Sequence, residues 1–151
     1  MKFERHVPIG PWERCVFQAC VFANYSEFRA AVALDRSDSV VWWMRNDPAV
    51  FVIPTPVGGF EPDFLYVRNH GGAAVRGALE VKGDFLWPAP EQPDRIKARA
   101  AGEWVKKANE ISPTEPWELA VVGDQEAKSA VHLGDLLDAA AGRLYVGPSA
   151  A

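Results

Sequence analysis

Residues 63–82 read DFLYVRNHGGAAVRGALEVK and predict a β-hairpin. Two runs, 63–68 and 76–82, are interpreted as strands, the first of them with Phe64, Tyr66 and Val67. Between them, residues 69–72 (Asn-His-Gly-Gly) have the composition of a turn. We therefore expect two antiparallel strands joined by a tight connection.

The register of this hairpin brings two acids together. Pairing about the midpoint between Gly71 and Gly72 places Asp63 opposite Glu80, with Cβ atoms about 5 Å apart. Two carboxylates so placed repel each other unless a positive group lies between them. Lys82, which shares a strand face with Glu80, is one candidate, and a divalent cation is another. Taken alone, the Glu-x-Lys triplet is also an ordinary ion-pair ladder on a solvated strand.

The rest of the chain alternates helical and strand patterns. The expected elements are a helix with Ser26 as its N-cap over 27–34, strands over 40–44, 50–53 and 117–122, a helix over 94–109, and a helix-prone tail over 124–141 with frayed final residues. The apolar stripe of helix 94–109 runs through either Ile96, Ala100 and Trp104 or Ala101 and Val105. This order predicts an α/β or α+β fold with a mixed β-sheet flanked by helices.

Composition fits one domain with a real core. The chain has 151 residues, 48% of them hydrophobic, and a formal net charge of −4. That charge argues against a domain that grips nucleic acid by charge alone. No window is long and apolar enough for a membrane span, and residues 1–10 lack a signal-peptide stretch, so we expect a cytoplasmic protein with no membrane partner.

The cysteines and histidines form no metal-binding pattern. Cys15 and Cys20 do not make a disulfide framework, and if their apolar run is a strand, the odd spacing puts the two thiols on opposite faces. We expect reduced cysteines that serve packing. The histidines, His6, His70 and His132, have neither each other nor a cysteine at ligand spacing, so zinc is not expected.

At this point the sequence resembles a known family. Pro62-Asp63 followed by Glu80-Val81-Lys82 resembles the PD-(D/E)XK phosphodiesterase motif. The similarity extends to the C-terminal endonuclease domain of type III restriction subunits through segments 25–28, 41–46 and 53–64 and through Lys97, Trp104, Asn109 and Trp117. It covers about residues 12–122. The resemblance implies a restriction-endonuclease-like α/β core.

The resemblance also implies roles for individual residues. Asp63 and Glu80 would bind Mg²⁺, or Mn²⁺ in its place, with the Val81 carbonyl as a further ligand and Glu27 completing the acidic cluster. Lys82 would orient or help deprotonate the attacking water and stabilise charge on the phosphate. Hard oxygen ligands suit Mg²⁺, and phosphodiester hydrolysis needs both an activated nucleophile and charge stabilisation.

Several of these residues have competing interpretations. The helix dipole favours an acid such as Glu27 in a first turn without any catalytic reason, and Glu13 is a competitor for its role. Lys97, Arg45 and Trp87 are candidate nucleic-acid contacts. A solvated surface position explains Lys97 equally well, and Trp87 stands in a Pro-rich loop that fits packing on the core as well as contact with nucleic acid.

Together these observations predict a Mg²⁺-dependent DNA endonuclease of restriction or defence type. The chain has no Gly-x-x-x-x-Gly-Lys-Ser/Thr loop, so it lacks an ATP-driven motor of that kind, and a translocase or specificity subunit is an expected partner. We expect one nuclease-like domain over 1–151, with a core at 12–122 and a helical extension at 124–141 that allows homo-oligomerisation. The alternative is a non-catalytic interaction module with a retained nuclease fold. An RNA-directed nuclease ranks lower, because no RNA-reading motif is present.

Overall fold

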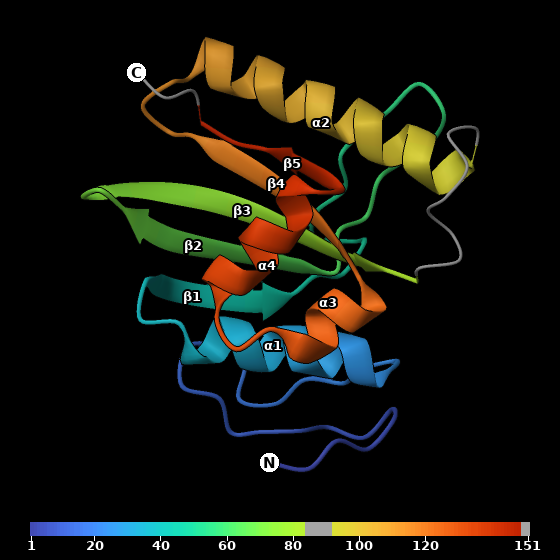
Figure 1. Cartoon of the computed structure of the whole chain (residues 1–151), viewed down its shortest axis with the longest axis vertical. Coiled ribbons are helices and arrows are strands. Elements are labelled where there is room, and N and C mark those ends of the chain that lie inside the picture. The colour runs from blue at the N-terminus through green and yellow to red at the C-terminus, as the bar shows by residue number, and fades with distance from the viewer. Residues whose placement is uncertain (84–91, 149–151) are drawn as a thin grey trace.

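One five-stranded sheet organises the chain in this computed structural model, which describes residues 1–83 and 92–148. The strands are β1 (Val40–Arg45), β2 (Phe64–His70), β3 (Ala73–Lys82), β4 (Trp117–Gly123) and β5 (Leu144–Val146). The helices are α1 (Tyr25–Arg36), α2 (Pro93–Ile111), α3 (Asp124–Ser129) and α4 (Leu133–Ala141). The strands lie in chain order, with β3 and β4 parallel and the other neighbours antiparallel (Figure 1). The predicted α/β class with a mixed sheet flanked by helices is confirmed.

The hairpin of β2 and β3 forms in the predicted register. Phe64 pairs with Leu79 at one end of the ladder and His70 with Ala73 at the other. The connection is two residues long, and both Gly71 (φ 59°) and Gly72 (φ 83°) adopt the left-handed backbone that such turns require. The pairing that continues this ladder by one residue places Asp63 opposite Glu80.

Helices cover both faces of the sheet. Because side chains alternate along β2, Phe64 packs in a cluster with α1, α3 and α4, and Leu65 packs on the other face with α2 (Figure 1). Helix α2 is the crossover between the parallel strands β3 and β4. Its buried stripe includes Ala101 and Val105, whereas Ile96 is 39% exposed, so the second of the two predicted stripes is the correct one.

Two local predictions before the hairpin are wrong. Residues 50–53 do not form a strand: Ile53 makes an isolated bridge with Phe60, and the carbonyl of Asp47 accepts the N–H groups of Val50 and Phe51 in a turn. The N-cap of α1 is Asn24 rather than Ser26, because the Asn24 side chain accepts the Glu27 N–H at 2.9 Å.

The chain after β4 is helical where this was predicted, as two short helices, α3 and α4. Beyond them Leu144–Val146 pair with β4 as β5, which was not predicted, and the final residues 149–151, where fraying was predicted, lie outside the described residues. Leu133 and Leu136 of α4 are buried in the same core cluster as α1. The segment therefore belongs to the core packing of the molecule.

The prediction for the cysteines is also wrong in its geometry. Residues 15–20 form no strand: Cys15 makes an isolated bridge with Trp43 and Cys20 another with Ile9. The two thiols adjoin each other, with sulfur atoms 3.6 Å apart, instead of pointing to opposite faces.

No helix within residues 1–83 and 92–148 combines the length and the apolar surface needed to cross a bilayer.

Candidate active site

Asp63 and Glu80 meet at the open end of the β2–β3 hairpin. Asp63 directly precedes β2, and its Oδ2 accepts the backbone N–H of Val81 at 2.8 Å, which draws the carboxylate across to β3. The backbone before β2 is fixed by Asn46, whose N–H donates to the Asp63 carbonyl at 2.7 Å and whose Nδ2 donates to the Pro62 carbonyl at 2.9 Å. The predicted meeting of the two acids is therefore present.

Glu80 is a buried acid in an unfavourable position. The residue is only 5% exposed. Burial, a hydrogen bond with Asp63 and the negative charge of Asp63 raise the pKa of Glu80 well above its usual value, and Lys82 opposes them only in part. The pair is thus a place where a positive ligand would relieve an electrostatic cost.

Lys82 shares the strand face of Glu80, as predicted. Its Nζ lies 3.5 Å from Glu80 Oε2 and 3.7 Å from Asp94 Oδ1, at the start of α2. Burial lowers the pKa of Lys82, but the negative charges of Glu80, Asp94 and Asp63 outweigh burial and raise it overall. The amine of Lys82 is therefore protonated in the free protein, where ion pairs with Glu80 and Asp94 hold it in place.

Glu27 reaches the same cluster through an arginine. Its Oε2 accepts the Ala23 N–H at 3.1 Å and lies 3.1 Å from Arg45 Nη2. Arg45 Nη1 donates to the Asp63 carbonyl at 3.1 Å and lies 3.8 Å from Asp63 Oδ1. Burial and the charge of Asp63 raise the pKa of Glu27 above its usual value, although the charge of Arg45 opposes them. Arg45, a predicted nucleic-acid contact, thus lies among the acids and links Glu27 to Asp63.

Glu13, the competitor of Glu27, lies away from the acids. Its side chain is 82% exposed and pairs with Arg14 at 3.4 Å, and its backbone N–H donates to Asp35. Of the two candidates, only Glu27 is linked to Asp63.

A polar cavity of about 200 Å³ opens beside the acid pair. It is lined by Glu80 and Lys82 of β3, Asp94 and Lys97 of α2, and the segment Gly59–Glu61. Lys97 therefore lies at the same cavity as Lys82, which is the position expected of a phosphate contact. Trp87, the remaining predicted contact, lies outside the described residues.

The donor set fits a cation that keeps most of its water. Across residues 1–83 and 92–148, no group of three or more His, Cys, Asp or Glu side chains is arranged to hold a metal ion. Asp63 and Glu80 offer two carboxylates, and Mg²⁺ is commonly held by one or two carboxylates together with water and substrate oxygens. The mutually repelling pair, of which Glu80 is buried and Asp63 partly buried, therefore fits Mg²⁺ better than it fits a structural metal.

Sequence reasoning missed two residues of this site and gave a third, Arg45, a different role. Asn46 clamps the Pro62–Asp63 backbone, Asp94 pairs with Lys82, and Arg45 was expected at DNA rather than between acids. Only Asp94 carried a sequence signal, since an acid directly after Pro93 marks the first turn of a helix.

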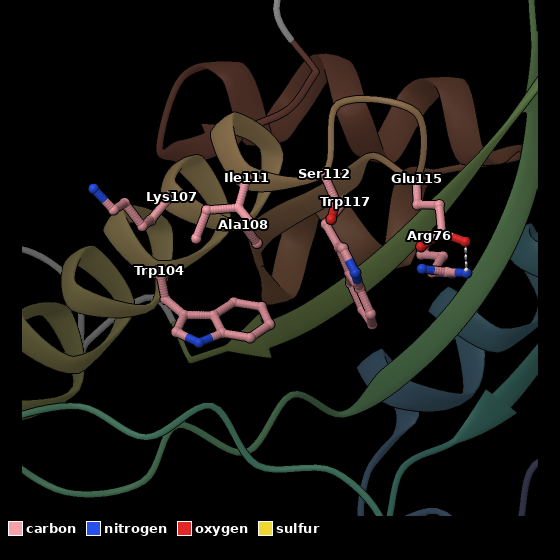
Figure 2. Close-up of a pocket in the computed structure, with 8 residues that line it drawn as sticks. All are labelled: Arg76, Trp104, Lys107, Ala108, Ile111, Ser112, Glu115 and Trp117. Atoms are coloured by element: carbon pink, nitrogen blue, oxygen red, sulfur yellow. Dashed lines mark ion pairs between the residues drawn. The ribbon is translucent and has the colours of Figure 1, made fainter.

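A larger cavity, of about 330 Å³, lies at the other end of α2. Figure 2 shows the indole rings of Trp104 and Trp117 at this cavity, with the ion pair of Arg76 and Glu115, 3.5 Å apart, at its rim. It has no paired acids and no amine beside an acid pair, so it offers none of the chemistry found at the hairpin.

The chain was compared with known proteins at three levels. No family model, no curated protein and no solved structure matches it.

Proposed function

We propose that this protein is a divalent-cation-dependent nuclease that hydrolyses DNA phosphodiester bonds at the Asp63–Glu80 pair. The observation that carries the proposal is a pair of carboxyl groups, one buried and one partly buried, with a lysine amine 3.5 Å from the buried one, at the wall of a polar cavity. A hairpin selected only for folding has no need of opposed acids, because they destabilise it.

Each residue has a task in this proposal. Asp63 and Glu80, with the Val81 carbonyl, would hold Mg²⁺, which supplies Lewis-acid stabilisation and an activated water when bound. Lys82 stands where its amine can orient the attacking water and stabilise charge on the phosphate. Glu27 holds Arg45, and Arg45 in turn fixes the backbone and carboxylate of Asp63.

The finer fold assignment belongs to the same proposal. The β2–β3 hairpin, the crossover helix α2 and the parallel strand β4 are the elements that we propose as a PD-(D/E)XK core. Lys97, at the cavity wall, is the proposed phosphate contact on α2. Because the net charge is −4, we propose that affinity for DNA comes in part from a partner, such as a translocase or specificity subunit.

The direct test is nicking of supercoiled plasmid DNA by the purified protein with Mg²⁺ or Mn²⁺. We expect cleavage that EDTA stops and that Asp63→Asn or Lys82→Ala lowers by about a hundredfold or more. Glu13→Gln is the matched control, because this acid is exposed and remote from the cavity, and it should cleave like the unchanged protein.

Other outcomes separate the alternatives. Equal cleavage by the unchanged protein and by both site variants would contradict the proposal. No cleavage, together with no heat on titration with Mn²⁺, would favour a non-catalytic interaction module. Cleavage of RNA but not DNA under the same conditions would reassign the substrate.

A further inference from the structure

Cys15 and Cys20 adjoin each other beside the outer edge of β1, where Cys15 pairs with Trp43. Their sulfur atoms are 3.6 Å apart. Backbone pairing fixes each cysteine in place, Cys15 against Trp43 and Cys20 against Ile9. Residues 16–19, which connect them, are exposed. The fold therefore presents two thiols at close range and leaves the connecting residues free to adjust.

The two thiols have different surroundings. Cys20 is buried, with 6% of its surface exposed, whereas Cys15 is partly exposed and its sulfur accepts the Phe17 N–H at 3.4 Å. The hydrogen bond from Cys20, together with that from Phe17, lowers the pKa of Cys15 in spite of its partial burial, and the hydrogen bond to Cys15 raises that of Cys20. Cys15 is thus the accessible nucleophile and Cys20 the buried proton donor beside it.

We propose that Cys15 and Cys20 form a reversible dithiol–disulfide modification site that hydrogen peroxide oxidises. The site is independent of the proposed nuclease activity, because it is defined by the contact of the two sulfurs and by the backbone around them.

The reaction proceeds in two steps. The Cys15 thiolate attacks one peroxide oxygen, the O–O bond breaks, and hydroxide leaves with formation of a sulfenic acid. The Cys20 sulfur then attacks the Cys15 sulfur, the S–O bond breaks, and the S–S bond forms as the Cys20 proton leaves with hydroxide as water. The two thiols lose two electrons and two protons, and the peroxide is reduced to two water molecules.

Closure requires a small movement of the two sulfurs. An S–S bond is about 2.05 Å long, so the sulfurs, now 3.6 Å apart, must approach each other by roughly 1.5 Å. Backbone pairing of Cys15 with Trp43 ties one of the cysteines to β1, whereas the residues between the two cysteines are exposed.

The test uses the full chain, first reduced and then treated with stoichiometric hydrogen peroxide. We expect the intact mass to fall by about 2 Da, both free thiols to disappear, and a dithiol reductant to restore them. In Cys20→Ser the sulfenic acid of Cys15 should persist and be trapped by a dimedone-type reagent, whereas Cys15→Ser should show neither product.

Retention of both thiols after oxidation, or their loss only through cross-links between chains, would overturn the proposal. This readout does not involve DNA cleavage, so a failure of the proposed nuclease function leaves the measurement intact.

Discussion

Glu80 shows at the scale of one residue how this chain gives up stability at its candidate site. The carboxyl is buried and lies against Asp63, and both effects disfavour its charged form. An unfavourable contribution to the free energy of folding is typical of functional positions, where the best residue for folding differs from the best residue for chemistry.

Replacement of this acid by its amide is therefore expected to stabilise the free protein. Glu80→Gln removes the like charge and keeps the shape and a hydrogen bond to Asp63. We predict a gain of about 1 kcal/mol in the free energy of unfolding, measured by urea denaturation in EDTA at neutral pH.

The matched control for Glu80→Gln is Glu61→Gln. Glu61 lines the same cavity but is exposed, so its replacement should change the free energy of unfolding by less than about 0.5 kcal/mol. A loss of stability in Glu80→Gln would show that the acid is a structural element and would weaken the case for a cation site.

Among the residues of the candidate site, the sequence predicted those that lie close together because they belong to one hairpin. Asp63, Glu80 and Lys82 follow from the register of one hairpin, which a two-residue turn fixes. Arg45 and Asn46 could not be predicted as parts of the site, because their contacts depend on how β1 lies against the segment before β2. The loop that carries Trp87 stays a prediction.

At the scale of elements, the hairpin depends on a glycine opposite a tyrosine. Gly77 pairs with Tyr66, and a Cβ placed on Gly77 would lie 2.0 Å from a carbon of the Tyr66 ring. The ring is fully buried and its hydroxyl donates to Glu118 at 2.7 Å, so it has no room to withdraw.

Gly77→Ala is therefore expected to destabilise the protein by about 3 kcal/mol, as overpacking does in a filled core. Gly134→Ala is the matched control, because Gly134 lies in α4 with nothing within 4 Å of an added Cβ. That variant should be neutral or more stable, by up to about 1 kcal/mol. Equal unfolding midpoints for the two variants would contradict this account of the hairpin.

The elements themselves were predicted unevenly. Long periodic patterns predicted α2 and the hairpin, with ends within a few residues of those observed. Segment 50–53 has the composition of a strand, but its only strand-like pairing is the bridge of Ile53 with Phe60. Strand β5 has only three residues, too few for a recognisable sequence pattern, and it is a strand because it pairs with β4. Whether such a short segment forms a strand depends on its pairing partner, and the local sequence does not identify that partner.

At the scale of the whole molecule, one buried carboxylate joins three strands. Glu118 of β4 is fully buried and accepts from Tyr66 and Arg68 of β2 and from Tyr145 of β5, at distances of 2.6 to 2.9 Å. Arg68 is the cation of this network. Every member of it is satisfied, so it serves the architecture rather than chemistry.

The network predicts a specific pH dependence. Burial raises the pKa of Glu118, but the hydrogen bonds from Arg68, Tyr145 and Tyr66 outweigh burial and lower it below its ordinary value of 4.5. The unfolded chain therefore binds the proton more readily, and this stabilisation is present above pH 4.5 and is lost as the pH falls through the lowered pKa.

Glu118→Gln tests this dependence. The variant should lose about 3 kcal/mol of stability at pH 7, and the loss should shrink as the pH falls below the ordinary pKa of a glutamate. Glu115→Gln, which alters an exposed pair with Arg76, should change stability by less than about 1 kcal/mol at either pH. Chemical denaturation at several pH values measures both, and a difference between Glu118→Gln and the unchanged protein that stays constant with pH would contradict the assignment.

The central claim, that the two opposed acids hold a divalent cation, is tested most directly by anomalous diffraction from crystals soaked in Mn²⁺. The account predicts one strong peak between Asp63 and Glu80, about 2.1 Å from a carboxylate oxygen of each, that is absent in Asp63→Asn crystals. Density without such a peak at saturating Mn²⁺, or a peak equally strong in the variant, would contradict it.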